Sequence, residues 1–143
     1  MKKDAKRVLI AMSGGVDSST AAALLREQGY ICGGAMLRLC REPEVAHLAA
    51  QSAEDARRTA ERLGMDFYLF DETERFSRCV MEKFVAEYCA GRTPNPCIDC
   101  NRELKFGALL DRALEMGYDY LATGHYARID YDRAAGRWRL LRG

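Results

Sequence analysis

A glycine-rich turn lies directly between an apolar run and a helix-forming stretch near the start of the chain. Residues 8–12 (V-L-I-A-M) are continuously apolar, as is typical of a buried strand, and residues 21–26 are good helix formers. Between them lies S-G-G-V-D-S-S, at residues 13–19. Adjacent glycines allow a sharp backbone turn, and a helix N-terminus attracts anions through its N–H groups and its dipole. The stretch therefore predicts an α/β fold with a phosphate site at this turn.

The turn differs from the P-loop of common ATPases, because no lysine follows the glycines as G-x-x-x-x-G-K-[ST] requires. Without this lysine the turn is poorly suited to hold a γ-phosphate for transfer. It is better suited to a pyrophosphate that leaves as a unit, with Ser13, Ser18 and Ser19 as hydroxyl donors. S-G-G-x-D-S in this position resembles the PP-loop of the ATP pyrophosphatases, which adenylate an oxygen. An ordinary strand-to-helix turn is the structural alternative.

Apolar runs alternate with helical patterns along the first 125 residues. Strands are predicted at 8–12, 30–37, 66–70 and 118–123. Helices are predicted after the turn at 13–19, through residues 21–26, at 48–63, at a stretch ending near Gly91 and at about 101–116, with a polar connection at 40–47. This alternation predicts a doubly wound parallel sheet with helices on both faces and ligands at the carboxyl ends of its strands. The turn at 13–18 and Thr123-Gly124-His125 both follow strands, so we expect them to share a pocket. His125 either contacts the ligand there or caps the fourth strand.

The tail has a different pattern. Residues 127–131 and 137–141 read as two strands around a D-R-A-A-G turn, which predicts a β-hairpin. We therefore divide the chain into a PP-loop domain at 1–125 and, at 126–143, a hairpin that begins a further region beyond the chain. The hairpin region holds five arginines against two aspartates, which is either a solvated face or an RNA contact.

No apolar segment approaches the ~20 residues of a membrane span, so no membrane partner is expected. The start, M-K-K-D, is followed by too few apolar residues for a signal peptide, which predicts a cytoplasmic protein. Six cysteines in that compartment are expected to be thiols, metal ligands or redox groups. Of these, Cys32, Cys79 and Cys89 fall on a strand and a helix and are predicted to be buried.

A second informative site is G-R-T-P-N-P-C-I-D-C-N-R at residues 91–102. Its two prolines forbid regular helix and make the loop rigid. Cys100 is predicted just before a helix, where the helix dipole and the cations of Arg102 and Lys105 favour a thiolate and so a nucleophile.

Cys97 and Cys100 form a C-x-x-C pair. A structural zinc site needs two further ligands, and neither His47 nor His125 stands at a metal-binding spacing. A redox pair, or two ligands of a cluster completed elsewhere, stays open at this point.

Five stretches together resemble the tRNA-specific 2-thiouridylases of the MnmA type. They are A-M-S-G-G-V-D-S-S at 11–19, G-R-T-P-N-P at 91–96, Cys100-Asn101 with Lys105-Phe106, A-T-G-H-Y-A-R at 122–128 and L-L-R-G at 140–143. The PP-loop alone is shared with argininosuccinate, GMP and NAD synthetases, whereas the cysteine loop combined with T-G-H-Y is much more specific. The resemblance implies a PP-loop, HUP-like fold. It also implies that ATP adenylates the C2 oxygen of the tRNA wobble uridine, and that a sulfur donor then displaces AMP to leave 2-thiouridine.

The resemblance also implies roles for individual residues. The positions that would line the ATP phosphates are Ala11, Met12, Ser13, Gly14, Gly15, Val16, Asp17 and Ser18. Leu37 would meet the adenosine and Gly124 would pack against the nucleotide. Cys100 matches the nucleophilic cysteine, and Asp17 is expected on the magnesium or pyrophosphate side. The loop facing the target base would be Asn95, Pro96 and Cys97.

The implied cofactors are ATP and Mg²⁺, and the implied partners are tRNA and a protein that donates persulfide sulfur. Many family members have aspartate where this chain has Cys97, so an iron–sulfur cluster bound by Cys97 and Cys100 is an alternative to a persulfide relay. The second catalytic cysteine of the family and its tRNA-contacting segments lie beyond Gly143. We therefore expect this chain alone to bind ATP without transferring sulfur.

Two other readings stay open. One is a related ATP pyrophosphatase that acts on another RNA base or a small carboxylate. The other is a nucleotide-binding module without catalysis. The thiouridylase reading requires the turn at 13–19 and Cys100 to open into a common cleft.

Overall fold

The computed structural model describes residues 5–41 and 43–142. Residues 1–4, 42 and 143 lie outside the described part, and with them the M-K-K-D start, one residue of the predicted 40–47 connection and the last residue of the predicted hairpin region.

The central sheet has four parallel strands in the order β3-β2-β1-β4. Their bounds are β1 (Arg7–Ala11), β2 (Ile31–Arg38), β3 (Asp66–Asp71) and β4 (Tyr120–Ala122). The chain passes from β1 outward to β3 and then returns to place β4 on the other side of β1. This reversal creates a topological switch point, where a parallel sheet opens a crevice at the carboxyl ends of its strands.

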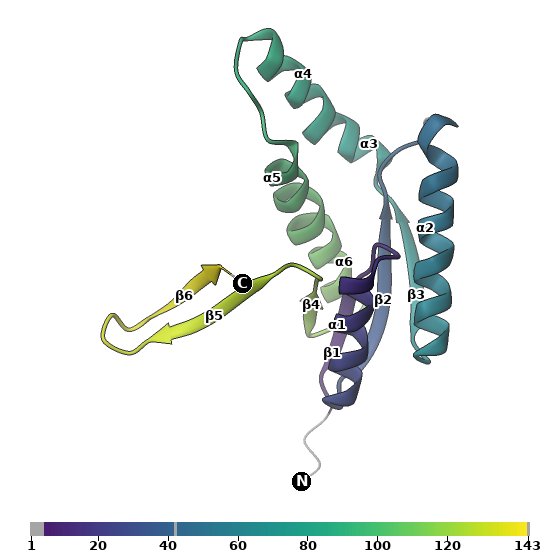
Figure 1. Cartoon of the computed structure of the whole chain (residues 1–143), viewed down its shortest axis with the longest axis vertical. Helices are drawn as coiled ribbons and strands as arrows, with labels where there is room; N and C mark the ends of the chain where they lie inside the picture. The colour runs from purple at the N-terminus through teal and green to yellow at the C-terminus, as the bar shows by residue number, and fades with distance from the viewer. Residues whose placement is uncertain (1–4, 42, 143) are drawn as a thin grey trace.

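Helices cover both faces of this sheet (Figure 1). On one face α1 (Val16–Glu27) and α2 (Pro43–Arg62) pack against Val8 and Ile10 of β1 through small residues such as Ala22 and Ala56. On the other face Leu9 of β1 contacts the core formed by α6 (Leu109–Glu115). Alternate residues of β1 therefore enter opposite cores, as expected for a strand buried on both sides.

Two helical segments beside the sheet extend past its carboxyl edge and lie next to each other (Figure 1). One comprises α3 (Thr73–Phe76), the π-helical η1 (Ser77–Met81) and α4 (Glu82–Cys89); the other comprises α5 (Pro96–Cys100), the π-helical η2 (Asn101–Ala108) and α6. Asp99, which is buried, receives hydrogen bonds from Lys83 at 2.6 Å and from Arg102 at 2.8 Å. Nearer the sheet, Arg112 donates to buried Glu72 at 2.7 Å. The Lys83–Asp99 and Arg112–Glu72 pairs link the two segments, whereas the Arg102–Asp99 pair lies within the second segment.

The tail forms an antiparallel hairpin of β5 (Ala127–Asp132) and β6 (Arg137–Arg142), which stands away from the parallel sheet (Figure 1). Asp132 accepts hydrogen bonds from the backbone N–H groups of Ala134 and Ala135, each at 3.0 Å. A carboxylate that accepts in this way stabilises a tight turn. The predicted hairpin is thus confirmed.

The predicted fold class is confirmed: a doubly wound parallel sheet with helices on both faces and a terminal hairpin. Two helix starts were placed wrongly. The predicted polar connection at 40–47 is in large part helix, because α2 begins at Pro43, and the helix predicted from about 101 begins at Pro96. Proline suits the first position of a helix, since its fixed φ is helical and its missing N–H has no partner there.

The prediction that Cys89 is buried is also wrong. Cys89 is exposed, and Cys32 and Cys79 are half-buried. Cys89 ends α4, which lies beyond the sheet and has no buried residue in the described structure, so no second layer covers it. No helix among the described residues is both long and apolar enough to cross a bilayer.

Gly14 is required by both backbone conformation and packing. Its φ is +78°, and a Cβ built there would lie 2.6 Å from the backbone oxygen of Ser52 in α2. Gly29 has a similar φ of +88° with nothing within 4 Å of a built Cβ, which makes it a matched control.

We expect Gly29→Ala to lower the free energy of unfolding by about 1 kcal/mol, the cost of a left-handed conformation for alanine. Gly14→Ala is expected to cost a further ~1–3 kcal/mol, because the turn and α2 must move apart. Urea denaturation of both variants measures the difference. Equal losses would contradict the close packing of the turn against α2.

Candidate functional site

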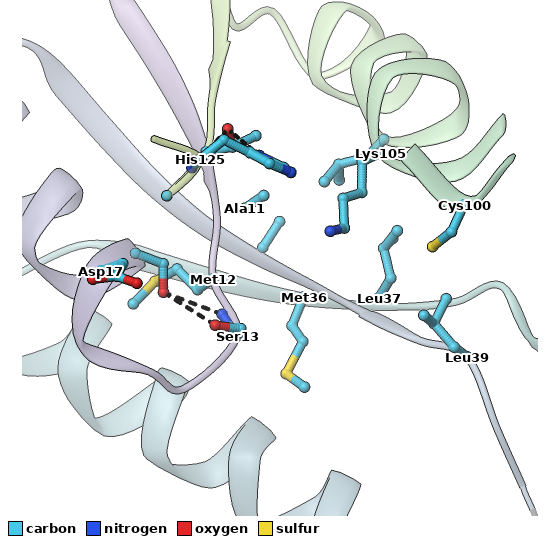
Figure 2. A pocket seen from close by; sticks show the side chains of 15 residues that line it. Ala11, Met12, Ser13, Asp17, Met36, Leu37, Leu39, Cys100, Lys105 and His125 are labelled. Carbon is cyan, nitrogen blue, oxygen red and sulfur yellow. Dashed lines mark hydrogen bonds between the residues drawn. The ribbon is translucent and has the colours of Figure 1, made fainter. Parts of the chain in front are cut away.

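A cavity of about 360 Å³ opens at the carboxyl ends of β1, β2 and β4 (Figure 2). Its walls are mostly apolar, with a few polar groups on opposite sides. The described lining residues are Ala11, Met12, Ser13, Asp17, Ser18, Ala35, Met36, Leu37, Leu39, Cys100, Lys105, Leu109, Thr123, Gly124 and His125. An apolar pocket with a few convergent polar groups is the usual form of a small-molecule site.

One wall is the turn between β1 and α1. Buried Ser18 accepts a hydrogen bond from the Ser13 N–H at 3.3 Å and donates to the Gly15 carbonyl at 3.3 Å, which closes the turn on itself. Gly15 is the N-cap of α1 and provides no side-chain cap. The first N–H groups of a helix have no partner within it. A glycine cap therefore leaves this helix end open to an anion, as phosphate binding requires.

Gly124, after β4, packs directly against the start of α1. A Cβ at this position would lie 2.9 Å from the Ser18 nitrogen and 3.2 Å from the Asp17 carbonyl carbon. Only glycine allows the T-G-H segment to approach the helix this closely, so the two predicted motifs meet in the structure.

Two side-chain contacts hold the polar groups around this junction. The Tyr126 hydroxyl donates to Asp17 Oδ1 at 2.8 Å, and this hydrogen bond to a carboxylate raises the pKa of Tyr126. His125 Nδ1 lies 2.8 Å from the Thr123 hydroxyl, and its ring packs against Phe106 with centroids 5.7 Å apart. His125 thus both lines the cavity and has structural contacts.

The opposite wall carries Cys100, at the end of α5. The thiol is half-buried, and burial raises its pKa above the ordinary value; the Lys105 ammonium opposes this shift and Cys97 adds to it. The expectation that a helix start favours a thiolate at Cys100 is wrong. The helix begins four residues earlier, at Pro96, and the dipole effect is confined to the first turn.

The residues predicted to face the target base do not line the cavity. Asn95 is the N-cap of α5 and accepts a hydrogen bond from the Cys97 N–H at 3.2 Å, with Pro96 at the first helical position. Cys97 is exposed. Cys97 and Cys100 are three residues apart on one helix, so they share a face. Within the described residues no group of three or more His, Cys, Asp or Glu side chains is placed to hold a metal ion.

The structure brings most of the predicted nucleotide-binding residues together with Cys100. Those that line the cavity are Ala11, Met12, Ser13, Asp17, Ser18, Leu37 and Gly124. Gly14, Gly15 and Val16 instead line a shallow hollow on the outer side of the turn, and Val16 is 81% exposed. These three would contribute backbone rather than side chains.

Sequence reasoning missed several lining residues. Met36 precedes Leu37 in β2, and Leu39 follows the last residue of that strand, so the strand-end position that pointed to Leu37 applies to them as well. Lys105 was noted as a cation near Cys100 and as part of the family resemblance, but not as a lining residue. In an α-helix, neighbours on one face are three or four residues apart, whereas η2 is π-helical, with hydrogen bonds between residues five apart. That irregularity gave no sequence signal.

Comparison with known proteins agrees with this fold. The family described as the tRNA methyl transferase HUP domain matches residues 6–143. The chain is 56% identical over 138 residues to the tRNA-specific 2-thiouridylase MnmA 1 of Syntrophus aciditrophicus, with 94% of this chain and 37% of that protein covered. It is 50% identical over 145 residues to the tRNA-specific 2-thiouridylase MnmA of Carboxydothermus hydrogenoformans, with 96% of this chain and 40% of that protein covered.

Among solved structures, the U34-tRNA thiolase NcsA from Methanococcus maripaludis with its [4Fe-4S] cluster aligns with a TM-score of 0.62 at 21% identity, covering 87% of this chain and 40% of that one. At this identity the similarity shows the fold alone. The chain spans about two fifths of the length of the curated relatives named above. Its sequence match over residues 6–143 shows that the chain belongs to the tRNA methyl transferase HUP domain family.

Proposed function

We propose that this chain is the adenylating part of a tRNA 2-thiouridylase. ATP adenylates the C2 oxygen of the wobble uridine with release of pyrophosphate, and sulfur then displaces AMP to give 2-thiouridine. The observation that carries the proposal is that the turn at 13–18 and Cys100 line one cavity at the switch point of the sheet. The common cleft that this chemistry needs is therefore available.

The nucleotide would lie across this cavity. The backbone and hydroxyl groups of residues 11–18 would hold the phosphates, Leu37 would meet the adenosine, and Gly124 would let the nucleotide approach the sheet. Asp17 is the one carboxylate among the described lining residues, so it is our candidate for the magnesium or pyrophosphate side. Bound Mg²⁺ would supply charge neutralisation for the departing pyrophosphate.

Cys100 is our candidate nucleophile, with Asn95, Pro96 and Cys97 near the entering base and a persulfide-bearing protein as the sulfur source. The Cys97 and Cys100 thiols are also suitable ligands for an iron–sulfur cluster. Two ligands do not complete such a site, and the described residues supply no third. A cluster would thus need ligands from outside them.

Residues 1–125 would form the adenylation domain and 126–143 the start of the next region, in a cytoplasmic protein. The hairpin offers arginines for tRNA phosphates. Of these, Arg139 pairs with Asp130 and Asp132, while Arg128, Arg133 and Arg137 form no ion pair within the described part of the chain.

The direct test joins residues 1–143 to the remainder of the S. aciditrophicus relative and measures 2-thiouridine in tRNA digests together with AMP release. Cys100→Ser is expected to lower thiolation by about 100-fold or more, since a hydroxyl cannot replace the nucleophile. Asp17→Ala is expected to lower AMP release as well. Cys89→Ser, on exposed α4, is the matched control and should leave both unchanged. Full thiolation by Cys100→Ser would refute the nucleophile assignment.

The same assay separates the alternatives. Because the chain spans about two fifths of its relatives, ATP binding without sulfur transfer is the second candidate function for the chain by itself. Calorimetry with ATP on residues 1–143 tests it, and formation of 2-thiouridine by this chain alone would exclude it. AMP release from the chimera with unchanged tRNA nucleosides would favour a pyrophosphatase with another substrate.

The raised pKa of Cys100 predicts a specific pH dependence. Iodoacetamide alkylates the thiolate and not the thiol. The thiolate fraction at neutral pH falls when the pKa rises, so alkylation of Cys100 is slower there. We expect the alkylation rate of Cys100 by iodoacetamide to inflect above the ordinary cysteine value of about 8.5. Peptide mass spectrometry between pH 6 and 10 follows Cys100 and exposed Cys89 in the same sample. An inflection for Cys100 near or below pH 7 would contradict the effect of burial.

Iron and acid-labile sulfide in the anaerobically purified chimera decide between a cluster and a persulfide relay. If a cluster is bound, Cys97→Ala should lower both contents together, while Cys89→Ala should not. Iron and sulfide at background in the unsubstituted chimera would leave the persulfide relay as the mechanism.

A further inference from the structure

Lys105 lines the cavity and has a charged side chain with no ion-pair partner among the described residues. Figure 2 shows its side chain directed inward from η2, on the wall that carries Cys100. It is the one permanent cation among the described lining residues. Lys105 is half-buried and forms no ion pair or hydrogen bond with any described residue. Lys83 and Arg102, on the same helical segments, both pair with Asp99.

The other polar groups of the cavity do not neutralise this ammonium. Asp17 accepts from Tyr126, and His125 is within hydrogen-bonding distance of Thr123. The rest of the lining is mostly apolar. The Lys105 ammonium therefore has no carboxylate partner among the described residues. An anionic ligand in the cavity would provide such a partner, so the position of Lys105 is suited to binding an anion.

We propose that the Lys105 Nζ binds the α-phosphate of the nucleotide, an inference that rests on the proposed adenylation. The open N-terminus of α1 offers its N–H groups to the terminal phosphates on one wall. The α-phosphate is the group that must face the other wall, where Cys100 lies, because sulfur replaces the oxygen attached to it. Lys105 would thus supply the cation that the glycine-rich turn lacks, and would stay with AMP after pyrophosphate leaves.

The π-helical geometry of η2 explains how the lysine is presented. In residues 101–108 the backbone hydrogen bonds join residues that are five apart. Lys105 is five residues after Cys100, and with this spacing both residues line the cavity, while Leu104 is buried in the core. π-Helical turns are rare in proteins, and those that occur are frequently found at functional sites.

Calorimetric titration of residues 1–143 with ATP, AMP and adenosine tests the assignment. Lys105→Met keeps the length of the side chain and removes its charge. We expect it to weaken ATP and AMP by the same factor, about tenfold or more for a lost charged phosphate contact, and to leave adenosine unchanged. Lys105→Arg should restore most of the affinity for both nucleotides. The matched control is Arg62→Met, which removes an exposed charge at the end of α2 and should bind all three ligands normally.

The pattern of losses distinguishes the alternatives. Unchanged affinity for AMP in Lys105→Met, with weaker ATP, would place the ammonium on a terminal phosphate and overturn the α-phosphate assignment. Equal weakening of adenosine would show a structural role and overturn it as well. Unsubstituted chain that binds no adenine nucleotide would refute the proposed function itself, whereas intact ATP binding with an unaffected Lys105→Met variant would refute only this inference.

Discussion

The burial of β1 between β2 and β4 is the constraint on which the site depends. Leu9 and Ile10 are completely buried, one in each core, so β1 cannot shift without exposing apolar surface on both faces. The strand order reverses beside β1. The turn that follows β1 therefore lies at the crevice that opens at the carboxyl edge of the sheet. Gly14 and Gly124 then allow α2 and β4 to close around the turn. The position of the turn, where we propose that phosphate binds, is therefore a consequence of core packing.

Local patterns were enough to predict this half of the site. The apolar run at residues 8–12, the two glycines and the strand-end position of T-G-H each act through neighbouring residues or through a general rule of parallel sheets. The errors have local explanations too. Asn95-Pro96 is an N-cap followed by proline, a standard helix start, and reading it as a rigid loop displaced the helix start to about 101. Pro43 misled the prediction of α2 in the same way.

The other half of the site depends on contacts between residues distant in sequence. The helical segment that carries Cys100 to the cavity is anchored to the preceding segment and packs on the sheet through Leu109 and Ala113. Asp99, next to Cys100, is held by Lys83 from α4, and Arg112 reaches back 40 residues to Glu72. No periodicity encodes which carboxylate meets which cation, and a buried carboxylate that loses its partners is strongly destabilising. The exposure of Cys89 likewise follows from how far this pair of segments extends beyond the sheet.

Lys105 and Cys100 lie on the same wall of the cavity, so the charge of the lysine bears on both steps of the proposed reaction, adenylation and sulfur transfer. Burial raises the pKa of the Cys100 thiol, and the Lys105 ammonium opposes this shift. In the proposed chemistry Cys100 must lose its proton to act as a nucleophile, so a cation that lowers its pKa favours the reaction. An approaching polyphosphate would raise the pKa of the thiol further. A lysine that pairs with phosphate on the same wall limits that effect, because it neutralises the charge nearest the sulfur. If Lys105 binds the nucleotide as proposed, nucleotide binding and the pKa of the Cys100 thiol would be coupled through this one side chain.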